Sequence, residues 1–476
     1  MSTPVGSAPD ERDHYVRAAG AGRSQVILES RPEAQAPAGV AAAWQLDQSR
    51  VVKLPGSLSP EVFECRSEVD RVEPCEAGMP PPSSPVGLST YVGTYPPALY
   101  VVPGVAMRLA DDPVAAARLG RLAGALLSIL FIGLAALVLW NPATGWRSLL
   151  GLVAVATPMV VYTASTLSPS GPEAASALCF FACILRIART RAAGTTVWVA
   201  LGLSGLTLVL ARDLGPVWMA LGAVFLLVLA GLRGTAGRVK AGGRAAAAAL
   251  VLALCGLAAA LIWQATQQVR PDAGAGEVAA GLVPSPGMLQ AVYFQTIGNF
   301  GVLDTPMNLA AYLGWTLLLG GLAVLGLVRG SRKQRLLLLG TGAATLVVVA
   351  VLDAIQRTVG FGAQGRHVLP MVAAFGLLAG EMAFGGDAAK RGWERNAGLA
   401  FAGIAAAIHG FAWFTAARRY AVGLDGPALF LQAPVWSPPG GWVVWALVAA
   451  VAAGLLVVAF AAGRFGEDGS GATPAR

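Results

Sequence analysis

Three residues near the start of the chain have types and spacing suited to acid–base chemistry. Asp10 and Glu11 follow Pro9, and His14 comes four positions after Asp10. Residues four apart lie on one face of a helix, so Asp10 and His14 can face the same way. Because a positioned carboxylate can remove the proton of a hydroxyl group, we expect Asp10, Glu11 and His14 to be catalytic. The alternative is a solvated helix start, since Pro followed by acidic residues is typical of a first helical turn.

Polar residues at the mouths of later apolar segments form a second candidate group. Arg366 follows Gly365, whose small size allows close approach of the backbone, and an Arg beside apolar surface requires a partner. Arg212 lies at a tight hairpin tip. Arg binds phosphate through two parallel hydrogen bonds, so this group favours an anionic substrate. The predicted substrate-binding residues are Arg212, Asp304, Gln364, Arg366, His367, Tyr95 and Tyr100.

Simpler structural roles are open for several of these residues. Arg212 could anchor a helix end in the membrane interface by snorkelling. Asp304 could cap a helix start, and Glu173 could match the dipole of the apolar segment that it begins. Tyr95 and Tyr100 could belong to an interfacial aromatic belt, although flat phenol rings also suit a sugar.

The elements that must position these residues are membrane helices. Of the 476 residues, 55% are hydrophobic and only 13% are charged, whereas a soluble domain carries about 25% charged residues. The net charge of +8 does not indicate nucleic-acid binding, because no basic stripe is interleaved with aromatic residues. Helices satisfy their own backbone groups in lipid. Composition therefore predicts an all-α polytopic membrane protein, with membrane lipid and no nucleic acid as partner.

Eleven apolar segments approach the length of about 20 residues that a helix needs to cross a bilayer. They comprise residues 122–140, 149–166, 172–188, 195–211, 214–232, 245–263, 309–328, 336–352, 368–384, 397–416 and 442–460. After the first span, one alternate set of loops carries seventeen Lys and Arg residues and the other set six. Cytoplasmic loops are the ones enriched in these residues. We therefore predict a bacterial cell-membrane protein with a cytoplasmic C-terminus and with the candidate residues outside.

The same alternation predicts the domain organisation. Residues 1–121 form an extracytoplasmic subdomain with some strand and with an interfacial helix near 98–109. Residues 122–463 form the transmembrane domain, which includes an external loop at 264–308. Residues 464–476 form a disordered cytoplasmic tail.

A polar first segment of this kind does not usually cross a membrane unaided. Nothing in it resembles a signal peptide. We therefore expect a twelfth apolar helix upstream of Met1 in the natural gene product.

The cysteines divide into two groups. Cys65 and Cys75 lie ten positions apart in the first segment, where an oxidising compartment would allow a disulfide. Two free thiols are the alternative. Cys179, Cys183 and Cys255 lie in apolar segments and are interpreted as small buried residues.

Five short motifs occur in order along most of the chain. They are Pro9-Asp10-Glu11 with His14, Tyr95-Pro96-Pro97 with Tyr100, Ser168-Pro169-Ser170-Gly171, Gly301-Val302-Leu303-Asp304-Thr305-Pro306, and Gln364-Gly365-Arg366-His367-Val368-Leu369-Pro370. Together they resemble a family of bacterial polytopic membrane proteins catalogued as domain of unknown function 2142. Two positions depart from the family pattern, because Ser170 stands where Asp is common and His367 where Tyr is common. In the family a transmembrane helix normally precedes the first motif.

The resemblance implies the fold of the GT-C glycosyltransferases, which use polyprenyl-phosphate sugars outside the membrane. In those enzymes an acidic residue of the first external loop acts as base or as a metal-linked group. Carried over, this role falls on Asp10 or Glu11. A divalent metal stays open as a cofactor.

The leading hypothesis is a membrane glycosyltransferase that transfers a sugar from a polyprenyl-phosphate carrier to a cell-envelope glycan or protein. One acidic candidate would take the acceptor's proton, and Arg212, Arg366 and His367 would offset the charge of the departing phosphate. One alternative is a transporter of lipid-linked glycans or solutes, which would place charges at the bilayer midplane rather than at loop mouths. A non-catalytic membrane subunit is another. Motifs for ATP hydrolysis, dinucleotide binding and serine nucleophiles do not occur.

Overall fold

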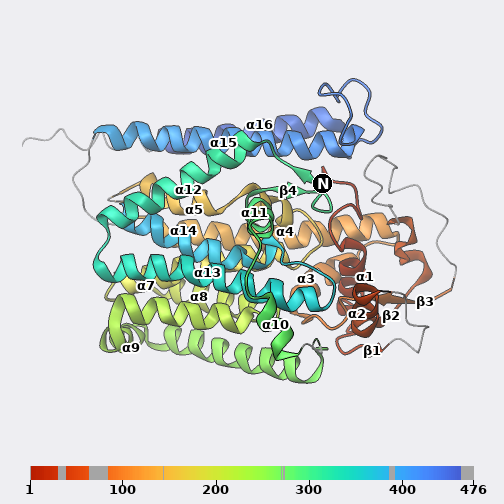
Figure 1. The fold of residues 1–476 in the computed structure, drawn as a ribbon, viewed down its shortest axis with the longest axis horizontal. Helices are drawn as coiled ribbons and strands as arrows, with labels where there is room; N and C mark the ends of the chain where they lie inside the picture. Colours follow the sequence, from red (N-terminus) through yellow and green to blue (C-terminus); the bar gives the residue numbers. More distant parts are fainter. Residues whose placement is uncertain are drawn as a thin grey trace, which may run out of the picture.

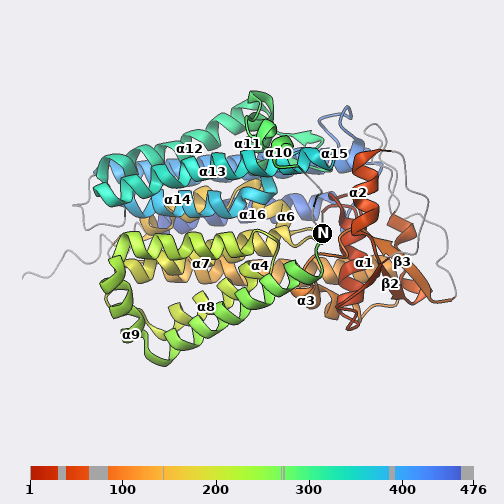
Figure 2. The same cartoon turned by 60° about the horizontal axis from the view of Figure 1, so that its bottom comes forward.

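The computed structural model describes residues 2–30, 39–63, 84–142, 144–269, 271, 274–384 and 392–462. Its long helices run side by side in one bundle. The N-terminal region, with its short strands, covers one end of that bundle (Figure 1, Figure 2). This arrangement agrees with the all-α polytopic membrane protein that the composition predicts.

The N-terminal region consists of short elements around one buried helix. These elements are α1 (Glu11–Ala21), β1 (Glu29–Ser30), α2 (Val40–Gln48), β2 (Arg50–Leu54), η1 (Gly56–Leu58), η2 (Pro60–Phe63), β3 (Val86–Thr90) and α3 (Ala98–Met107). The strands form an antiparallel sheet in the order β1-β2-β3, with Val52 opposite Leu88. Gly20 of α1 packs on Val52, and Gly22 after its end lies against Gly104 of α3. Side chains at either glycine would separate these layers, so small residues fix α1 between the sheet and α3.

The remaining elements form the bundle. They are α4 (Pro113–Leu139), η3 (Trp146–Leu149), α5 (Leu150–Val155), α6 (Pro158–Ala164), α7 (Ser170–Arg189), α8 (Thr195–Val209), α9 (Gly215–Thr266), α10 (Ala275–Gly281), α11 (Pro286–Ile297), β4 (Asn299–Phe300), β5 (Thr305–Pro306), α12 (Leu309–Arg329), α13 (Arg332–Thr358), η4 (Gly365–Val368), α14 (Leu369–Phe384), α15 (Gly392–Val422) and α16 (Gly441–Ala462). Local signals set several helix starts: the Asp112 side chain accepts from Ala115 N at 2.8 Å, and Ser331 and Gln334 form a capping box.

Each of the eleven apolar segments falls on helix, but the number of membrane spans stays a prediction. Among the described residues, eight helices are long and apolar enough to cross a membrane, or nine if the bent pair 146–155 and 158–164 is one span. Helix α9 accounts for part of the difference, because its 52 residues include two predicted segments. Gly231 and Gly243 break its helical geometry with φ values of 72° and 54°. The apolar helix α8, at 15 residues, is short for a span.

The centre of the bundle is formed by α7 and α14. Most of α7 is buried, including Cys179 and Cys183. On α14, a Cβ atom at Gly380 would lie 2.6 Å from the Cα atom of Gly151 of α5. Small residues that allow backbones to approach are typical of membrane helix packing. The buried centre holds the N-terminal end of α7 and the start of η4 in fixed positions, and both carry candidate residues.

Candidate functional site

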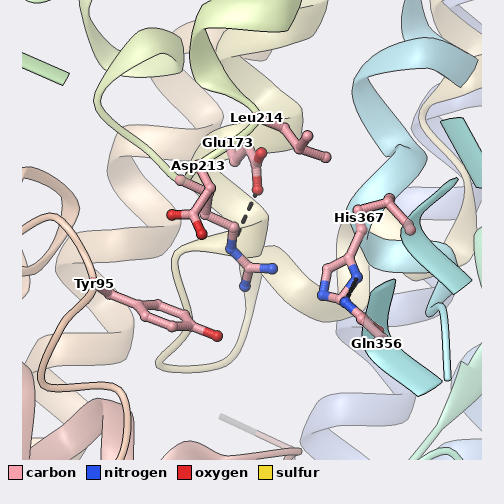
Figure 3. Close-up of a pocket in the computed structure, with 8 residues that line it drawn as sticks. Tyr95, Glu173, Asp213, Leu214, Gln356 and His367 are labelled. Atoms are coloured by element: carbon pink, nitrogen blue, oxygen red, sulfur yellow. Dashed lines mark hydrogen bonds and ion pairs between the residues drawn. The ribbon is translucent and has the colours of Figure 1, made fainter. Parts of the chain in front are cut away.

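A cavity of about 130 Å³ opens where the bundle meets the N-terminal region. Its lining comes from the turn before α3, the start of α7, the α8–α9 turn, the end of α13 and η4. Figure 3 shows Tyr95, Glu173 and His367 turned toward this common space. The lining residues are Tyr95, Glu173, Arg212, Asp213, Leu214, Leu352, Gln356 and His367. The structure therefore brings Tyr95, Arg212 and His367, three of the predicted residues, to one cavity.

Asp10 lies beside this cavity at the N-cap of α1, as the Pro-Asp-Glu sequence predicts for a helix start. Its backbone is left-handed, with φ 61°, a conformation that Asp tolerates better than most residues. The side chain does not cap the helix. Instead its Oδ1 accepts from the Tyr91 hydroxyl, and its Oδ2 lies 2.5 Å from Nη2 of Arg366. Asp10 and Arg366, 356 positions apart, are thus joined in one ion pair.

Neighbouring groups stabilise the charged form of Asp10. Burial alone would raise the pKa of Asp10, but the charge of Arg366 and the Tyr91 hydroxyl lower it more. The net result is a pKa below the ordinary value, so the carboxylate is charged at neutral pH. Its side chain keeps 30% of its exposure, so a ligand could reach it.

His14 lies one turn after Asp10 and is fully enclosed. Its Nδ1 is 2.8 Å from the Tyr100 hydroxyl. Its Nε2 is buried and is without a hydrogen-bond partner among the described residues. Burial is the main cause of a lowered pKa at His14; Asp10 opposes it and the charges of Arg212 and Arg366 add to it, and the net pKa is about 3. His14 is therefore neutral at physiological pH. Depending on its tautomer, its ring either donates or accepts the hydrogen bond with the Tyr100 hydroxyl.

The low pKa of His14 predicts an acid-sensitive fold. His14 takes up a proton near pH 6.5 in the unfolded chain but only near pH 3 in the folded chain. Protonation therefore favours the unfolded state as the pH falls between these values. The free energy of unfolding falls by up to about 1.4 kcal/mol for each pH unit in this range. We expect the melting temperature of the unchanged protein to fall faster between pH 6.5 and 4 than that of His14→Gln. Parallel curves for the two proteins would contradict a neutral buried His14.

Arg212 joins three elements at the cavity. Its Nη2 donates to the Ser170 hydroxyl at 2.7 Å, and its Nε lies 3.5 Å from Oε2 of Glu173. Its guanidinium carbon is 5.9 Å from the centre of the Tyr95 ring. The Glu173 carboxylate also accepts from Trp218 Nε1 at 3.4 Å. Glu173 is thus the charge partner of Arg212 in addition to standing in the first turn of α7, and Arg212 is oriented toward the cavity rather than toward lipid.

The segment η4 places Arg366 and His367 side by side. Gly365 N donates to Gln295 Oε1 at 2.8 Å, so η4 is fixed on α11. His367 Nδ1 lies 3.4 Å from Gln356 Nε2, and that ring lines the cavity. The side-chain Oε1 of Gln364 and Nε of Arg366 are buried without a hydrogen-bond partner in the described part of the chain.

Gly365 allows this placement because no side chain fits there. A Cβ atom would lie 2.6 Å from Gln295 Cβ, from Thr296 N and from Val292 O. Since two of these atoms are backbone, we expect Gly365→Ala to push η4 away from α11 and to cost about 1–3 kcal/mol of stability. Gly362→Ala is the matched control, because its Cβ would meet only Asp353 Oδ1, at 3.7 Å. Equal melting temperatures for the two variants would contradict the close packing of η4.

Glu11, the other acidic residue of the first motif, points away from the cavity. It is 2% exposed and pairs with Arg121 of α4, whose Nε and Nη2 lie 2.6 and 2.5 Å from its two oxygens. The backbone N–H groups of Leu167 and Gly6 also donate to it, each at 2.9 Å. A carboxylate with every oxygen engaged by the protein cannot accept a substrate proton without breaking the fold. The geometry therefore argues against the predicted catalytic role of Glu11 and gives it a structural one.

Asp304 belongs to a separate cluster. It lies in the β4–β5 turn, where its Oδ2 is 3.0 Å from Arg419 Nη2 and its Oδ1 accepts from Thr305 Oγ1 at 2.8 Å. It does not line the cavity described above. The predicted helix-cap role is also not observed, because the Asn308 side chain caps α12. Asp304 instead fixes the turn against the end of α15.

Tyr91, Tyr95 and Tyr100 form an aromatic wall around His14 and Asp10. Burial raises the pKa of all three phenols, so they remain neutral. The turn that carries Tyr95 is fixed by Arg17, which donates to the Tyr95 carbonyl at 3.0 Å. Tyr100 is thus buried and Tyr95 half-buried at the site, so a simple interfacial belt does not describe them.

Residues not among those predicted include Arg121, the partner of Glu11, and Gln356 of the cavity lining. Arg121 stands at the mouth of an apolar segment, and a charge in that position is itself a signal for a buried partner. Gln356 carries no such signal, because a single Gln near a helix end is common. Cys65 and Cys75 lie outside the described residues. Among the residues that the structure describes, no three His, Cys, Asp or Glu side chains are grouped to hold a metal ion.

Comparison with known proteins gives one family and two structures. The family described as "Predicted membrane protein (DUF2142)" matches residues 1–375. No curated protein is significantly similar to the chain. Two structures of ArnT from Cupriavidus metallidurans are similar, one in the apo state (19% identity, TM-score 0.41) and one bound to undecaprenyl phosphate (18% identity, TM-score 0.39). Both comparisons cover 77% of this chain and 64% of the ArnT chain, so the chain spans less than two thirds of that protein.

Proposed function

The chain belongs to the DUF2142 family of membrane proteins, and we propose that it transfers a sugar from a polyprenyl-phosphate carrier to an acceptor hydroxyl. The acceptor would be a cell-envelope glycan or a protein. By the positive-inside pattern, the reaction would take place on the outer face of the cell membrane. Residues 1–121 would then be an extracytoplasmic subdomain over the transmembrane domain.

One observation carries this proposal: buried polar atoms without a hydrogen-bond partner belong to residues of the cavity lining and to residues beside it. In the part of the chain that is described, these atoms include Arg212 Nε and Glu173 Oε2 of the lining, and Arg366 Nε and His14 Nε2 beside Asp10. A buried polar group without a hydrogen bond costs about 1–3 kcal/mol. Such groups in a folded protein require an explanation, and a polar ligand that satisfies them is one. Because two guanidinium groups, Arg212 and Arg366, flank the same place, an anionic ligand is favoured.

An apolar cavity beneath η4 supports a lipid carrier in particular. It measures about 290 Å³ and lies between α6, α11, α12, α13 and α14. Val368 of η4 lines it, two positions after Arg366. A phosphate held by Arg366 could therefore continue into a prenyl chain in apolar surroundings. Its apolar lining includes Leu289, Val292, Trp315, Leu319, Val349 and Val372.

The ion pair between Asp10 and Arg366 couples donor binding to base strength. With its pKa lowered by Arg366, Asp10 is a weak base in the free protein. A donor phosphate would compete with Asp10 for the Arg366 guanidinium. As Arg366 turns to the phosphate, the pKa of Asp10 rises toward its ordinary value, because the opposing charge is shared. Donor binding would thereby prepare the carboxylate to accept a proton.

In the transfer step, the acceptor oxygen attacks the anomeric carbon of the sugar. The bond from that carbon to the phosphate oxygen breaks, and polyprenyl phosphate leaves with the electron pair. Asp10 takes the proton of the acceptor hydroxyl. Arg366 and Arg212 offset the added charge on the phosphate, and the Tyr95 and Tyr100 phenols border the sugar. Attack opposite the leaving phosphate would invert the configuration of the anomeric carbon.

The proposal requires the cavity to widen. At about 130 Å³ it is smaller than the roughly 300–1,000 Å³ of typical ligand pockets. Arg212 and Arg366 are the groups that would move, since each now pairs with a carboxylate. Arg212 is held by Glu173 at 3.5 Å, a looser contact than the Arg366–Asp10 pair.

Binding of the product, polyprenyl phosphate, tests the proposal without knowledge of the sugar. We expect it to bind to purified protein and to raise its melting temperature. Arg366→Gln and Arg212→Gln should each weaken binding about tenfold or more, because each removes a charge-assisted hydrogen bond. Arg108→Gln, at an exposed position on the same side of the protein, should leave it unchanged.

Turnover is then tested with a panel of radiolabelled polyprenyl-phosphate sugars and cell-envelope fractions as acceptors. Transfer of label to the acceptor supports the proposal. Unaltered binding in both site variants would contradict the assigned site. Movement of intact donor across proteoliposomes without transfer would support the transporter alternative instead.

A further inference from the structure

The C-terminal end of helix α9 is bonded to two of the turns that line the cavity, although it does not line the cavity itself. This end of α9 lies beside α3 and the N-terminal region (Figure 2). Trp263 Nε1 donates to the Thr94 carbonyl at 2.8 Å. Gln264 Nε2 donates to the Asp213 carbonyl at 2.8 Å, and Gln268 Nε2 donates to the carboxylate of the same residue. One short stretch of α9 thus holds two turns that are distant from each other in the sequence.

These bonds lie next to two side chains of the cavity. Tyr95 directly follows Thr94, and Arg212 directly precedes Asp213. Tyr95 and Asp213 lie on one side of the cavity, across from His367 (Figure 3). The guanidinium carbon of Arg212 is 5.9 Å from the centre of the Tyr95 ring. The separation of these two side chains therefore depends on how the two turns are placed relative to each other.

Arg17 of α1 strengthens the hold on the turn that carries Tyr95. Its side chain is fully buried, and its Nη2 donates to the Tyr95 carbonyl at 3.0 Å. Its guanidinium carbon also lies 5.9 Å from the centre of the Trp263 ring, within the range of a cation–π contact. The consecutive carbonyls of Thr94 and Tyr95 are thus bonded by two side chains that contact each other. This arrangement ties the turn to α1 and to α9 together.

Close packing against α8 holds this part of α9 in place. Gly256 and Ala260 of α9 are both buried. A Cβ atom at Gly256 would lie 2.8 Å from Leu206 Cδ1 and from Val209 Cγ1 of α8. Small residues that let helix backbones approach closely are typical of membrane helix packing. Since α8 ends at Val209, shortly before Arg212, the last turns of α9 form a fixed support for the α8–α9 turn.

We propose that Trp263, Gln264 and Gln268 are positioning residues. They set the separation of the Tyr95 and Arg212 side chains, and so fit the cavity to a sugar joined to a phosphate. The proposal rests on the proposed function for these ligands, with the phosphate at Arg212 and the sugar at Tyr95. A displacement of about 1 Å can cost about 10²-fold in rate, even when the altered residue lies away from the reacting atoms.

The tryptophan is tested by a substitution that removes only its donor. Trp263→Phe deletes the Nε1–H group and keeps an aromatic ring beside Arg17. Trp445→Phe is the matched control, because Trp445 is also half-buried and its Nε1 donates to the Pro439 carbonyl at 2.9 Å, at the start of α16.

The glutamines are tested as a pair, because both bond to Asp213. The variant is Gln264→Ala with Gln268→Ala. The control is Gln267→Ala with Gln290→Ala, since the side chains of these two residues make no hydrogen bond with the described part of the chain. Amide hydrogen exchange, the dissociation constant of polyprenyl phosphate and kcat for sugar transfer are measured on each purified full-length protein.

We expect faster amide exchange at residues 91–97 in Trp263→Phe and at residues 210–214 in the glutamine variant, with no change in either control. Trp263→Phe should lower kcat about tenfold and change the dissociation constant of polyprenyl phosphate less than twofold, because Arg212 keeps its place. The glutamine variant should raise that dissociation constant about fivefold, since it frees the turn that carries Arg212.

Unchanged exchange in both turns would overturn the proposal. Equal changes of kcat and of affinity in the two variants would also overturn it, because a general loss of stability affects both quantities together. Faster exchange without any effect on kcat or affinity, in a protein that binds polyprenyl phosphate, would count against it as well. If the unchanged protein does not bind polyprenyl phosphate but both turns exchange faster in the variants, the proposed function fails and the positioning role is supported.

Discussion

Replacing Asp10 by Asn is expected to lower the turnover number for sugar transfer by about 10²–10⁴-fold, the range for loss of a general base. Polyprenyl phosphate should nevertheless bind at least as tightly as before. The amide oxygen of the new side chain would still accept from the Tyr91 hydroxyl, so the local structure is kept. Arg366, however, would lose the carboxylate that it contacts at 2.5 Å. Its guanidinium would then be available to the donor phosphate without competition.

The opposite movement of rate and affinity distinguishes this role from a structural one. A residue that only holds the site together would weaken both quantities when replaced. Asp13→Asn is the matched control, because Asp13 lies on the same helix and its Oδ1 accepts from Tyr91 N at 3.1 Å. That contact is available to Asn as well, so turnover should remain within about threefold. Turnover of Asp10→Asn within the same limit would contradict the assignment of Asp10 as base.

Two pH profiles follow from the same ion pair. In the free protein the pKa of Asp10 is below its ordinary value, so the acidic limb of kcat/KM should appear at low pH. In the proposed donor complex Arg366 would be shared with the phosphate, so the pKa of Asp10 would be higher. The acidic limb of kcat should therefore lie at higher pH than that of kcat/KM, since the first reports the complex and the second the free enzyme.

Hydropathy was sufficient to locate the helices of the bundle but not to count its spans. Segments such as 245–263 are apolar throughout, and lipid leaves helix as the only open-chain solution. The two segments within α9 could be recognised from their apolar runs, whereas the breaks at Gly231 and Gly243 could not. Glycine in a helix is compatible with both a straight and a broken path, and packing decides between them.

The sequence could indicate part of the site, since Tyr95, Arg212 and His367 line the cavity, but not the division of roles between Asp10 and Glu11. Asp10 and Glu11 are adjacent, and neighbouring residues at a helix start diverge by about 100°. Which one meets the cavity depends on Arg121, more than a hundred positions later. The partner of Arg366 is even more distant, at 356 positions in sequence. Spacing along the chain contains no information about such contacts, whereas the motif order placed Arg366 and Asp10 in one candidate set.

Replacing Arg121 by Gln is expected to destabilise the docking of the N-terminal region by about 3–5 kcal/mol. The change leaves the Glu11 carboxylate buried without its counter-charge, which is the costly half of a buried ion pair. It also removes the donors to the carbonyls of Thr3 and Pro4, at 2.6 and 2.7 Å. Limited proteolysis and thermal unfolding should both report the loss, with cleavage in the N-terminal region before the bundle unfolds.

The size of this effect follows from burial. Both side chains are 2% exposed, so water cannot replace the lost contact. An exposed arginine offers the comparison: Arg108→Gln removes the same charge at the end of α3, where it is solvated, and should change stability by less than about 0.5 kcal/mol. Equal stability of the two variants would contradict the structural role of the Glu11–Arg121 pair.

A double substitution distinguishes the effect of leaving one buried charge unpaired from the effect of changing the packing. Glu11→Leu with Arg121→Met removes both charges, so no unpaired carboxylate remains, and it should be less destabilising than Arg121→Gln alone. Recovery should be partial, because the N–H groups of Gly6 and Leu167 also lose their acceptor. If Asp10 is the base, this double variant should retain transfer in proportion to the fraction folded, whereas a catalytic Glu11 would leave a folded but inactive protein.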